Sequence, residues 1–515
     1  MNIRVYNTLS RQKEDFEPLT PGKVGIYLCG PTVYGPSHIG HMVGPVIFDT
    51  IKRYLTYSGF EVTWVVNITD VDDKLIKASN ERGIPMEDVA AEMTEDYCQN
   101  LKALGIDQID EMPKATDNMA EIITFIENLI EQDFAYAVDG DVFFDVGRDP
   151  EYGKLSNRTA DSQQGEGGEV AAKKRSASDF ALWKNAREGE PAWPSPWGEG
   201  RPGWHIECSA MSRGILGETF DIHGGGLDLV FPHHENEIAQ SECCHGRPMV
   251  KYWLHNGLLK LASQGKIGGR NDRQEPSEDS IQQATDEKVS RSKKAAALAG
   301  LLARQTGERV RFFLLSTHYR STIAFSEEGI EETGTAMEAF TRLFERYQRI
   351  SGQDFYEIQP IADRKAGEID SDGNALLDSV ADRRLSFLAN MDDDFNTGGA
   401  TSDLFEQVRS INRYIDGNDL ESAESRSEES LQALHRAMAT LRELTSILGI
   451  FRQPPEVADD AKDDLVDELM DIIIAVRAMA RQNKNFEMAD FIRDKLGEAS
   501  VTLEDRKDGT GWRRS

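Results

Sequence analysis

Hydrophobic and polar positions near the N-terminus alternate in a way that predicts a parallel α/β unit. A continuous apolar run over residues 24–29 predicts a buried strand, which Gly30 and Pro31 interrupt. Residues 46–55 then carry apolar side chains at spacings of one, three and four, which is typical of a helix with one buried face. A second strand is predicted over residues 60–66. Strand, helix and strand at this spacing favour a doubly wound parallel sheet.

The pattern changes several times farther along the chain. Residues 114–138 are predicted to be mainly helical, and a short strand follows at residues 142–145. A second α/β segment is predicted over residues 203–259, and the helical pattern of residues 301–450 indicates a bundle. No segment approaches the roughly 20 apolar residues that a membrane span needs, so no membrane association is expected.

These changes predict an α/β fold in which a Rossmann-like sheet domain is split by an inserted module and followed by a helical bundle and a small C-terminal module. The predicted segments are the first Rossmann-like half (1–113), the inserted connective module (114–202), the second half (203–260), a connector (261–335), the bundle (336–452) and the C-terminal module (453–515). The polar segment 261–287 is read as an exposed insertion within the connector.

The charge of the chain is strongly acidic. There are 89 Asp and Glu against 58 Lys and Arg, which gives a net charge of −31. A generic basic nucleic-acid binder is disfavoured, because the field around such a chain has the wrong sign. The 58 basic residues are 22 Lys and 36 Arg, and an acid excess with few lysines favours the surface of a halophilic protein. An ordinary acidic cytosolic enzyme is the alternative, and loss of the fold in low salt is the test.

The cysteines are few and odd in number, and the first ten residues contain no apolar signal region. Both observations favour a cytoplasmic location, in which a special cysteine is a metal ligand or nucleophile more often than a disulfide partner. The five cysteines are Cys29, Cys98, Cys208, Cys243 and Cys244.

The first candidate site follows the first predicted strand. His38, Gly40 and His41 open the predicted helix, so two imidazoles lie near a positive helix N-terminus and a flat ring could lie over the glycine. This arrangement suits a nucleoside triphosphate, and the glycine-rich P-loop motif is absent from the chain. Taken alone, the two histidines fit a structural or unrelated metal role at least as well.

A second candidate site combines residues that are far apart in the sequence. Cys29 ends the first strand, Cys208 lies in a Trp-His-Ile-Glu-Cys stretch, and a proline before His233 suits a helix start that places His233 and Glu237 one turn apart. Two thiolates, one imidazole and one carboxylate make a plausible tetrahedral zinc site. The alternative is that Cys29 and Cys208 are buried core thiols and that His233 and Glu237 lie on a solvated helix face. Because the four residues are so far apart in the sequence, this alternative is favoured when they are considered alone.

A third candidate site is a basic segment that follows the polar insertion. Lys288, Ser290 and Arg291 form a Lys-x-Ser-Arg-Ser sequence, and a loop of this kind could close over phosphates and stabilise charge on phosphorus. An isolated pentapeptide of this composition is otherwise a solvated basic turn.

The order of these motifs along the chain closely resembles that of the cysteinyl-tRNA synthetases, a family of class I aminoacyl-tRNA synthetases. The resemblance covers nearly the whole chain. It extends to residues 67–74 (Asn-Ile-Thr-Asp-Val-Asp-Asp-Lys), 221–229 (Asp-Ile-His-Gly-Gly-Gly-Leu-Asp-Leu), 391–397 (Met-Asp-Asp-Asp-Phe-Asn-Thr) and 489–494 (Ala-Asp-Phe-Ile-Arg-Asp).

The resemblance implies ligation of L-cysteine to tRNA-Cys in two steps, through a cysteinyl adenylate made from ATP. It implies that the two Rossmann-like halves are catalytic and that the C-terminal module binds the anticodon. One zinc ion per chain, both structural and substrate-binding, would be held by Cys29, Cys208, His233 and Glu237, and magnesium would accompany ATP. A monomer is expected.

The resemblance also implies roles for further residues. His38, His41, Lys288 and Arg291 would be catalytic, and together with Gly40 and Ser290 they would bind ATP. The cysteine pocket would be lined by Trp204 and His223, by Thr69 near the substrate carboxylate, and by Asp228, which would pair with the substrate ammonium.

A zinc–thiolate bond would explain how cysteine is selected over serine. Apolar packing discriminates poorly between two such similar molecules. Zinc lowers the pKa of a bound thiol, whereas a serine hydroxyl would have to lose a far less acidic proton. No editing domain is therefore expected.

The chain departs from the family pattern in the signature loop, which usually reads Lys-Met-Ser-Lys-Ser. Val289 and Arg291 replace the methionine and the second lysine, so the charge is kept but the point-charge geometry is not. Two alternatives share the core motifs: a cysteine ligase of mycothiol synthesis, which lacks a full anticodon-binding region, and a catalytically inactive RNA-binding paralogue. The C-terminal module disfavours the first, and the intact histidines and zinc ligands disfavour the second.

Overall fold

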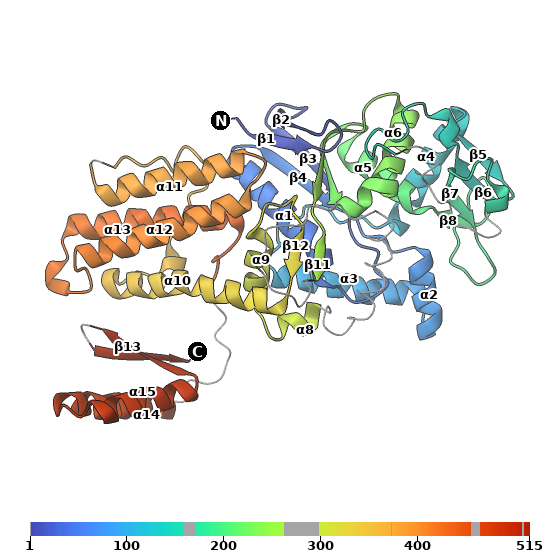
Figure 1. Cartoon of the computed structure of the whole chain (residues 1–515). Coiled ribbons are helices and arrows are strands. Elements are labelled where there is room, and N and C mark those ends of the chain that lie inside the picture. The colour runs from blue at the N-terminus through green and yellow to red at the C-terminus, as the bar shows by residue number, and fades with distance from the viewer. Residues whose placement is uncertain are drawn as a thin grey trace, which may run out of the picture.

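The computed structural model describes residues 2–158, 171–261, 298–371, 373–454, 464–506 and 509–514. A central parallel sheet lies between the inserted module on one side and the helical bundle on the other, and the C-terminal module lies below the bundle (Figure 1). Within these described residues, no helix is both long enough and apolar enough to span a membrane.

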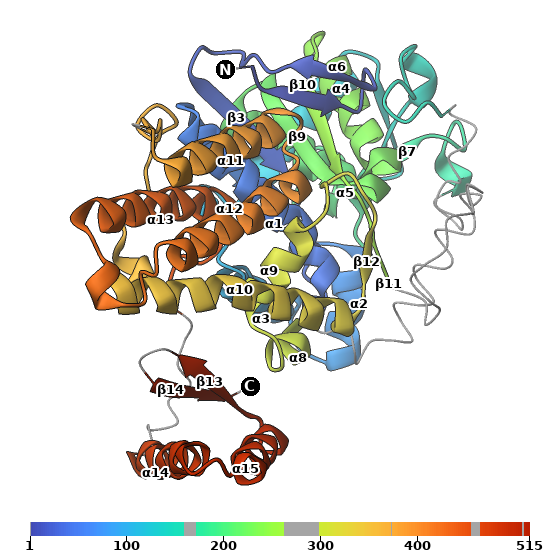
Figure 2. The same ribbon diagram turned by 60° about the vertical axis from the view of Figure 1, so that its left-hand side comes forward.

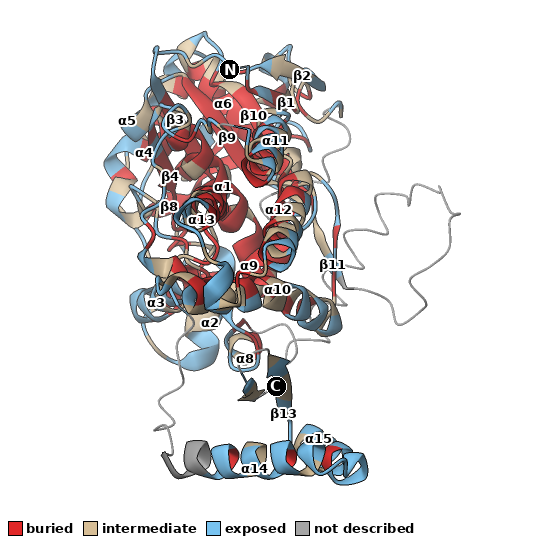
Figure 3. Ribbon diagram, turned by 90° about the vertical axis from the view of Figure 1, so that its left-hand side faces the viewer, coloured by how far each residue is buried: buried red, intermediate tan, exposed pale blue. Residues whose placement is uncertain are grey.

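The central sheet confirms the predicted doubly wound arrangement. Its strands run parallel in the order β10-β9-β3-β4. They are β3 (Lys23–Leu28), β4 (Glu61–Val66), β9 (Phe220–Gly226) and β10 (Val250–Asn256). Helix α1 (Ile39–Tyr57) connects β3 to β4, and Figure 3 shows this helix and the strands largely buried. Buried parallel strands carry apolar runs, which is why the sequence pattern located β3 and β4, whereas β9 and β10 were predicted only as part of the α/β segment of residues 203–259.

Helices and a small hairpin complete the sheet domain. Helices α2 (Asp73–Arg82) and α3 (Met86–Ala103) follow β4, while α5 (Trp204–Leu216) precedes β9 and α6 (Glu235–His245) joins β9 to β10. An N-terminal hairpin, β1 (Arg4–Asn7) and β2 (Gln12–Asp15), was not predicted. It contacts the edge of the sheet, where the Thr8 backbone N–H donates to the Trp253 carbonyl at 2.8 Å.

The inserted module packs helix α4 (Met119–Glu131) beside an antiparallel sheet of order β5-β6-β7-β8. The strands are β5 (Ala135–Val138), β6 (Asp141–Phe144), β7 (Phe180–Asn185) and β8 (Gly200–Pro202). The prediction of helix up to Val138 is wrong, because α4 ends at Glu131 and residues 135–138 form a strand. Asp139 and Gly140 have φ values of 47° and 83°, and such an Asp-Gly pair favours a tight hairpin turn.

The connector and the bundle follow the second half of the sheet. Strand β11 (Leu259–Leu261) pairs in parallel with β12 (Ile323–Phe325), and α8 (Leu298–Leu302) and α9 (Gly307–Leu315) lie between them in sequence. The bundle helices are α10 (Glu327–Ser351), α11 (Ala375–Asp392), α12 (Thr397–Gly417) and α13 (Glu428–Leu448), which lie beside α1 and α9 in Figure 2. Residues 301–450 are therefore helical as predicted, apart from the three-residue strand β12 and the connections between helices.

The turn between α11 and α12 ties the bundle to two other parts of the chain. Asp394 has a φ of 66°, and its carboxylate is completely buried. It accepts hydrogen bonds from the Tyr6 backbone N–H at 2.7 Å, the Tyr319 hydroxyl at 2.9 Å and Arg320 Nε at 2.7 Å. One side chain thus joins the N-terminal hairpin, the connector and the bundle.

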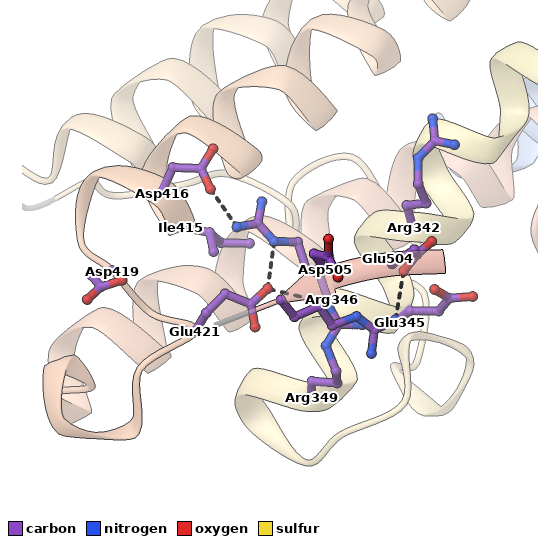
Figure 4. Close-up of a pocket in the computed structure, with 11 residues that line it drawn as sticks. Arg342, Glu345, Arg346, Arg349, Ile415, Asp416, Asp419, Glu421, Glu504 and Asp505 are labelled. Carbon is purple, nitrogen blue, oxygen red and sulfur yellow. Dashed lines mark hydrogen bonds and ion pairs between the residues drawn. The ribbon is translucent and has the colours of Figure 1, made fainter. Parts of the chain in front are cut away.

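The C-terminal module consists of helices α14 (Asp464–Gln482) and α15 (Phe486–Glu498) and a hairpin, β13 (Val501–Arg506) and β14 (Gly509–Arg514). Its hairpin faces the bundle, and Arg513 lies 3.3 Å from Glu338 of α10. A cleft of about 550 Å³ separates the two parts. Figure 4 shows the arginines of α10 in this cleft, among carboxylates from the α12 region and from β13.

Candidate metal and nucleotide site

Cys29 lies directly after β3, at the carboxyl edge of the parallel sheet. Its backbone N–H donates to the Gly224 carbonyl of β9 at 3.2 Å. The next residue, Gly30, donates its N–H to the Asn67 side-chain oxygen at 2.9 Å, and a Cβ at Gly30 would lie 1.7 Å from the Asn67 carbonyl oxygen. The thiol is therefore held where β3 and the loop after β4 approach most closely.

Cys208 lies in α5, which begins two residues after the last strand of the inserted module. Gly203 precedes this helix, and its N–H donates to the Leu182 carbonyl of β7 at 2.8 Å. A Cβ at Gly203 would lie 2.0 Å from the Ala181 carbonyl oxygen, so only glycine allows this approach. Cys208 follows one turn after Trp204 and is buried.

His233 and Glu237 come from the connection between β9 and α6. The predicted helix start at the proline is wrong in detail, because residues 230–234 form a wide π-helical turn with one non-helical residue and α6 begins only at Glu235. The expected pairing is nevertheless present, since His233 Nε2 lies 3.1 Å from Glu237 Oε1.

The four predicted metal ligands converge. Their ligand atoms all lie within 4.8 Å of one another. Cys29 Sγ is 3.8 Å from Cys208 Sγ and 3.4 Å from Glu237 Oε1. In a tetrahedral site with Zn–S bonds of roughly 2.3 Å and Zn–O bonds of roughly 2.1 Å, the S–S and S–O edges are about 3.8 and about 3.6 Å. The donor set and its spacing therefore fit a tetrahedral zinc ion.

The electrostatics of the cluster separate its ionisable groups. The hydrogen bond from Cys29 lowers the pKa of Cys208 to about 6, whereas burial and Cys208 raise the pKa of Cys29 well above its usual value. Burial opposes charge on Glu237 and His233. Attraction to His223 and His233 outweighs burial and lowers the pKa of Glu237, and attraction to Glu237 together with Cys208 raises the pKa of His233 to about 10. The cluster therefore stabilises charged side chains in a buried position, which is typical of a functional site.

Other histidines contact three of these four groups. His205 Nδ1 lies 2.9 Å from His233 Nδ1, and His223 Nε2 lies 2.9 Å from Glu237 Oε2. His234 Nε2 is 3.3 Å from Cys29 Sγ, and its other nitrogen is 2.7 Å from His255. Cys29, His223, His234 and Glu237 form a second overlapping group with metal-ligand spacing. The sequence reasoning did not assign roles to His205 or His255.

The residues predicted to line the cysteine pocket surround the cluster. The Trp204 ring lies 4.4 Å from the His233 ring, and Trp204 is 40% exposed. Thr69 is buried after β4, where its hydroxyl accepts a hydrogen bond from Asn67 at 3.3 Å. Asp228 lies in the turn after β9 and is exposed. His223, by contrast, is completely buried and contacts Glu237.

Glu207 is a further residue of this region that the sequence reasoning missed. It is completely buried and precedes Cys208 in α5. Burial and the charge of Cys208 raise its pKa well above the usual value. Neither of its carboxylate oxygens has a hydrogen-bond partner among the described residues, so Glu207 is a buried acid beside a predicted metal ligand.

The predicted nucleotide-binding histidines open helix α1. The rings of His38 and His41 stack with centroids 3.7 Å apart, and the His38 backbone N–H donates to His41 Nδ1 at 3.4 Å. A Cβ at Gly40 would lie 2.9 Å from the His38 ring, so glycine leaves this space free. Burial and His38 lower the pKa of His41 to about 3, and burial lowers the pKa of His38. Both imidazoles are therefore neutral near pH 7.

Lys288, Ser290 and Arg291 lie outside the described residues, as does almost all of the polar insertion. The chain is described again from Leu298, whose backbone N–H donates to the Ser37 carbonyl at 3.1 Å. Leu298 is thus anchored next to the residue that precedes His38.

Comparison with known proteins identifies relatives over the full length of the chain. Residues 15–267 match the family model of the class I (C) tRNA synthetase catalytic domain, and residues 386–452 match the DALR domain. The chain is 42% identical to the cysteine–tRNA ligase of Geobacillus thermodenitrificans, covering 100% of this chain and 99% of the relative. It is 43% identical to that of Geobacter metallireducens, with full coverage of both. The fold is similar to methionyl-tRNA synthetase of Mycobacterium tuberculosis bound by methionyl-adenylate (TM-score 0.55, 13% identity, 83% and 90% of the two chains).

Proposed function

Because the chain belongs to the cysteine–tRNA ligase family, we propose that it joins L-cysteine to tRNA-Cys. In the first step the cysteine carboxylate attacks the α-phosphorus of ATP, which forms cysteinyl adenylate and releases pyrophosphate. In the second step the 3′-terminal adenosine of the tRNA takes the cysteinyl group and AMP leaves. The single observation that carries this proposal beyond family membership is the Cys29, Cys208, His233 and Glu237 cluster beside Trp204 and Thr69.

The cluster supports selection of cysteine by its thiol. A zinc ion held by the four residues would favour a thiolate over a hydroxyl and would so reject serine. His205 and His223 orient His233 and Glu237 through hydrogen bonds, a type of contact that fixes the direction of metal ligands. We propose that Asp228 pairs with the substrate ammonium and that Thr69 donates its hydroxyl near the carboxylate.

His38 and His41 are proposed to bind the phosphates of ATP as neutral hydrogen-bond donors. Their lowered pKa values leave no positive charge on them near pH 7. The charge that stabilises the transition state would then come from Lys288, Arg291 and the magnesium ion bound with ATP. Gly40 is proposed to leave room for the flat base of the nucleotide. Ser290, in the signature loop, is proposed to contact ATP.

The parts outside the sheet are proposed to bind the tRNA. The bundle contains the segment that matches the DALR domain, and the C-terminal module is proposed to bind the anticodon, for which its exposed arginines and aromatic side chains are suited. A monomer in the cytoplasm with one zinc ion per chain completes the proposal.

The experiment measures cysteine-dependent ATP–pyrophosphate exchange, charging of tRNA-Cys with cysteine and with serine, and zinc content on one sample across a potassium chloride series. We expect exchange with cysteine, charging with cysteine only, and one zinc per chain. Exchange without charging of tRNA would favour a cysteine ligase with another acceptor. Failure of both activities in a folded, zinc-loaded protein would refute the proposal and favour an inactive RNA-binding paralogue.

A further inference from the structure

Asp73, the first residue of α2, connects the sheet domain to the inserted module. Its Oδ2 lies 3.0 Å from Lys184 Nζ, and its Oδ1 accepts a hydrogen bond from the Arg201 guanidinium. Lys184 belongs to β7 and Arg201 to β8. One carboxylate therefore holds two strands that are more than 100 residues away in the sequence.

The antiparallel register makes this contact possible. Lys184 and Arg201 face each other directly across β7 and β8, so both cations reach the same point beside α2. The Arg201 side chain is only 7% exposed, whereas that of Asp73 is 57% exposed. The contact therefore pairs Asp73 with a guanidinium that is largely removed from water, and whose Nε has no hydrogen-bond partner among the described residues.

Each end of the contact is a short chain distance from the proposed cysteine pocket. On one side, Asp73 lies four residues after Thr69, in a loop that is also held by Asp70, whose carboxylate accepts the Thr116 N–H at 3.0 Å. On the other side, Arg201 lies three residues before Trp204 and seven before Cys208.

We infer that Asp73 is a positioning residue for amino-acid recognition, which sets the distance between Thr69 on one wall of the cysteine pocket and Trp204 on the other by holding Lys184 and Arg201. This inference rests on the proposed function for the identity of the substrate. Asp73 itself is not expected to touch cysteine, ATP or the metal.

The test compares Asp73→Asn, Arg201→Gln and the double variant in cysteine-dependent ATP–pyrophosphate exchange. Because displacement of a binding group by about 1 Å can cost up to ~100-fold, we expect Asp73→Asn to raise KM for cysteine ~10-fold, with KM for ATP and zinc content unchanged. The double variant should be no worse than the more impaired single variant, since both substitutions break one contact. Asp73→Glu should recover most of the affinity.

Glu190→Gln is the matched control. Glu190 also lies near Arg201, at 3.8 Å, but it belongs to the inserted module, so its loss removes one charge without breaking the contact to α2. Its KM for cysteine should stay within twofold of the wild type. Hydrogen exchange adds a readout that does not need activity, because residues 200–208 should exchange faster in Asp73→Asn and not in Glu190→Gln.

Three results would overturn the inference: an unchanged KM for cysteine in Asp73→Asn, equal rises in KM for cysteine and ATP, or effects of the two single substitutions that multiply in the double variant. If Asp73→Asn does not fold, the same measurements on Asp73→Glu and Arg201→Gln decide the matter. Absence of cysteine-dependent exchange in the wild type would instead count against the proposed function, and hydrogen exchange would still test the contact.

Discussion

The buried carboxylate of Asp394 offers a sharp test of how the three parts around it are held together. The substitution Asp394→Asn keeps the size of the side chain and tolerates its φ of 66°, because asparagine adopts the left-handed region readily. The amide can still accept hydrogen bonds from the Tyr6 N–H and the Tyr319 hydroxyl, which both reach Oδ1. It cannot keep the ion pair between Oδ2 and Arg320.

The expected cost follows from these contacts. A hydrogen bond to a charged group contributes roughly 1.5–3 kcal/mol, and the two remaining bonds become neutral and weaker. We therefore expect a local loss of about 2–4 kcal/mol. A loss of about 2 kcal/mol corresponds to a roughly 30-fold faster exchange of a hydrogen-bonded amide through local opening.

The assay is hydrogen exchange followed by mass spectrometry on the peptide that contains Tyr6. The matched control is Asp393→Asn, the same substitution at the adjacent residue, whose carboxylate is 56% exposed and pairs with Lys13 at 2.8 Å. Such an exposed pair contributes only about 0–1 kcal/mol. Equal protection of the Tyr6 amide in the two variants would refute the reasoning.

The same carboxylate predicts the direction of a pH effect. Burial by itself would raise the pKa of Asp394, but His318, the Tyr6 N–H and Arg320 outweigh burial and lower it. Its stabilisation is therefore present above the usual aspartate pKa of about 3.9 and is lost as the pH falls through the lowered value. The difference between wild type and Asp394→Asn should shrink as the pH is lowered from 7 toward 3, and a difference that grows would contradict the assignment.

Three further predictions concern the proposed catalytic groups. Cys208→Ser should weaken zinc binding by at least ~100-fold, because substitution of a residue that merely hydrogen-bonds to a metal ligand can already cost that much. Metal analysis after dialysis against a chelator would show the loss, and full zinc occupancy would exclude Cys208 as a ligand. The pKa of His41, lowered to about 3 by burial and His38, predicts an imidazole that does not titrate between pH 5 and 8; nitrogen-15 NMR of labelled histidine would reveal a titration if the prediction is wrong. Arg291→Ala should slow adenylate formation far more than it weakens cysteine binding, which rapid-quench kinetics and equilibrium binding can compare; equal effects would argue against a phosphate contact.

Strands β3 and β4 of the central sheet were predictable because most of their residues are apolar and buried. Continuous apolar runs mark β3 and β4, and the helix between them has a clear apolar face. The hairpin strand β2 reads Gln-Lys-Glu-Asp and carries no alternation, so it was missed. β5 was assigned to the preceding helix because its four residues are too few to establish a period of two, and only the Asp-Gly turn distinguishes it.

The metal cluster could not be derived from spacing, because Cys29 and Cys208 are 179 residues apart and meet only through the sheet. The order of the motifs and the family resemblance supplied it. His255 could have been found, since it lies near the end of β10, and the carboxyl ends of parallel strands form the ligand-binding edge. The contact of Asp73 depends on the register of β7 and β8, which the sequence does not specify locally.

The ion pair between Arg513 and Glu338 has a consequence for how the C-terminal module is held against the bundle. Arg513 and Glu338 are both partly exposed, so their attraction weakens as salt screens it. The module is nevertheless part of the same chain as the bundle, and covalent linkage of two binding parts can maintain an effective concentration on the order of millimolar. Even a weak ionic contact can then bias the resting position of the module, while an arriving tRNA needs little free energy to displace it. Ionic strength would in this way set the balance between a C-terminal module that contacts the bundle and one that is released from it.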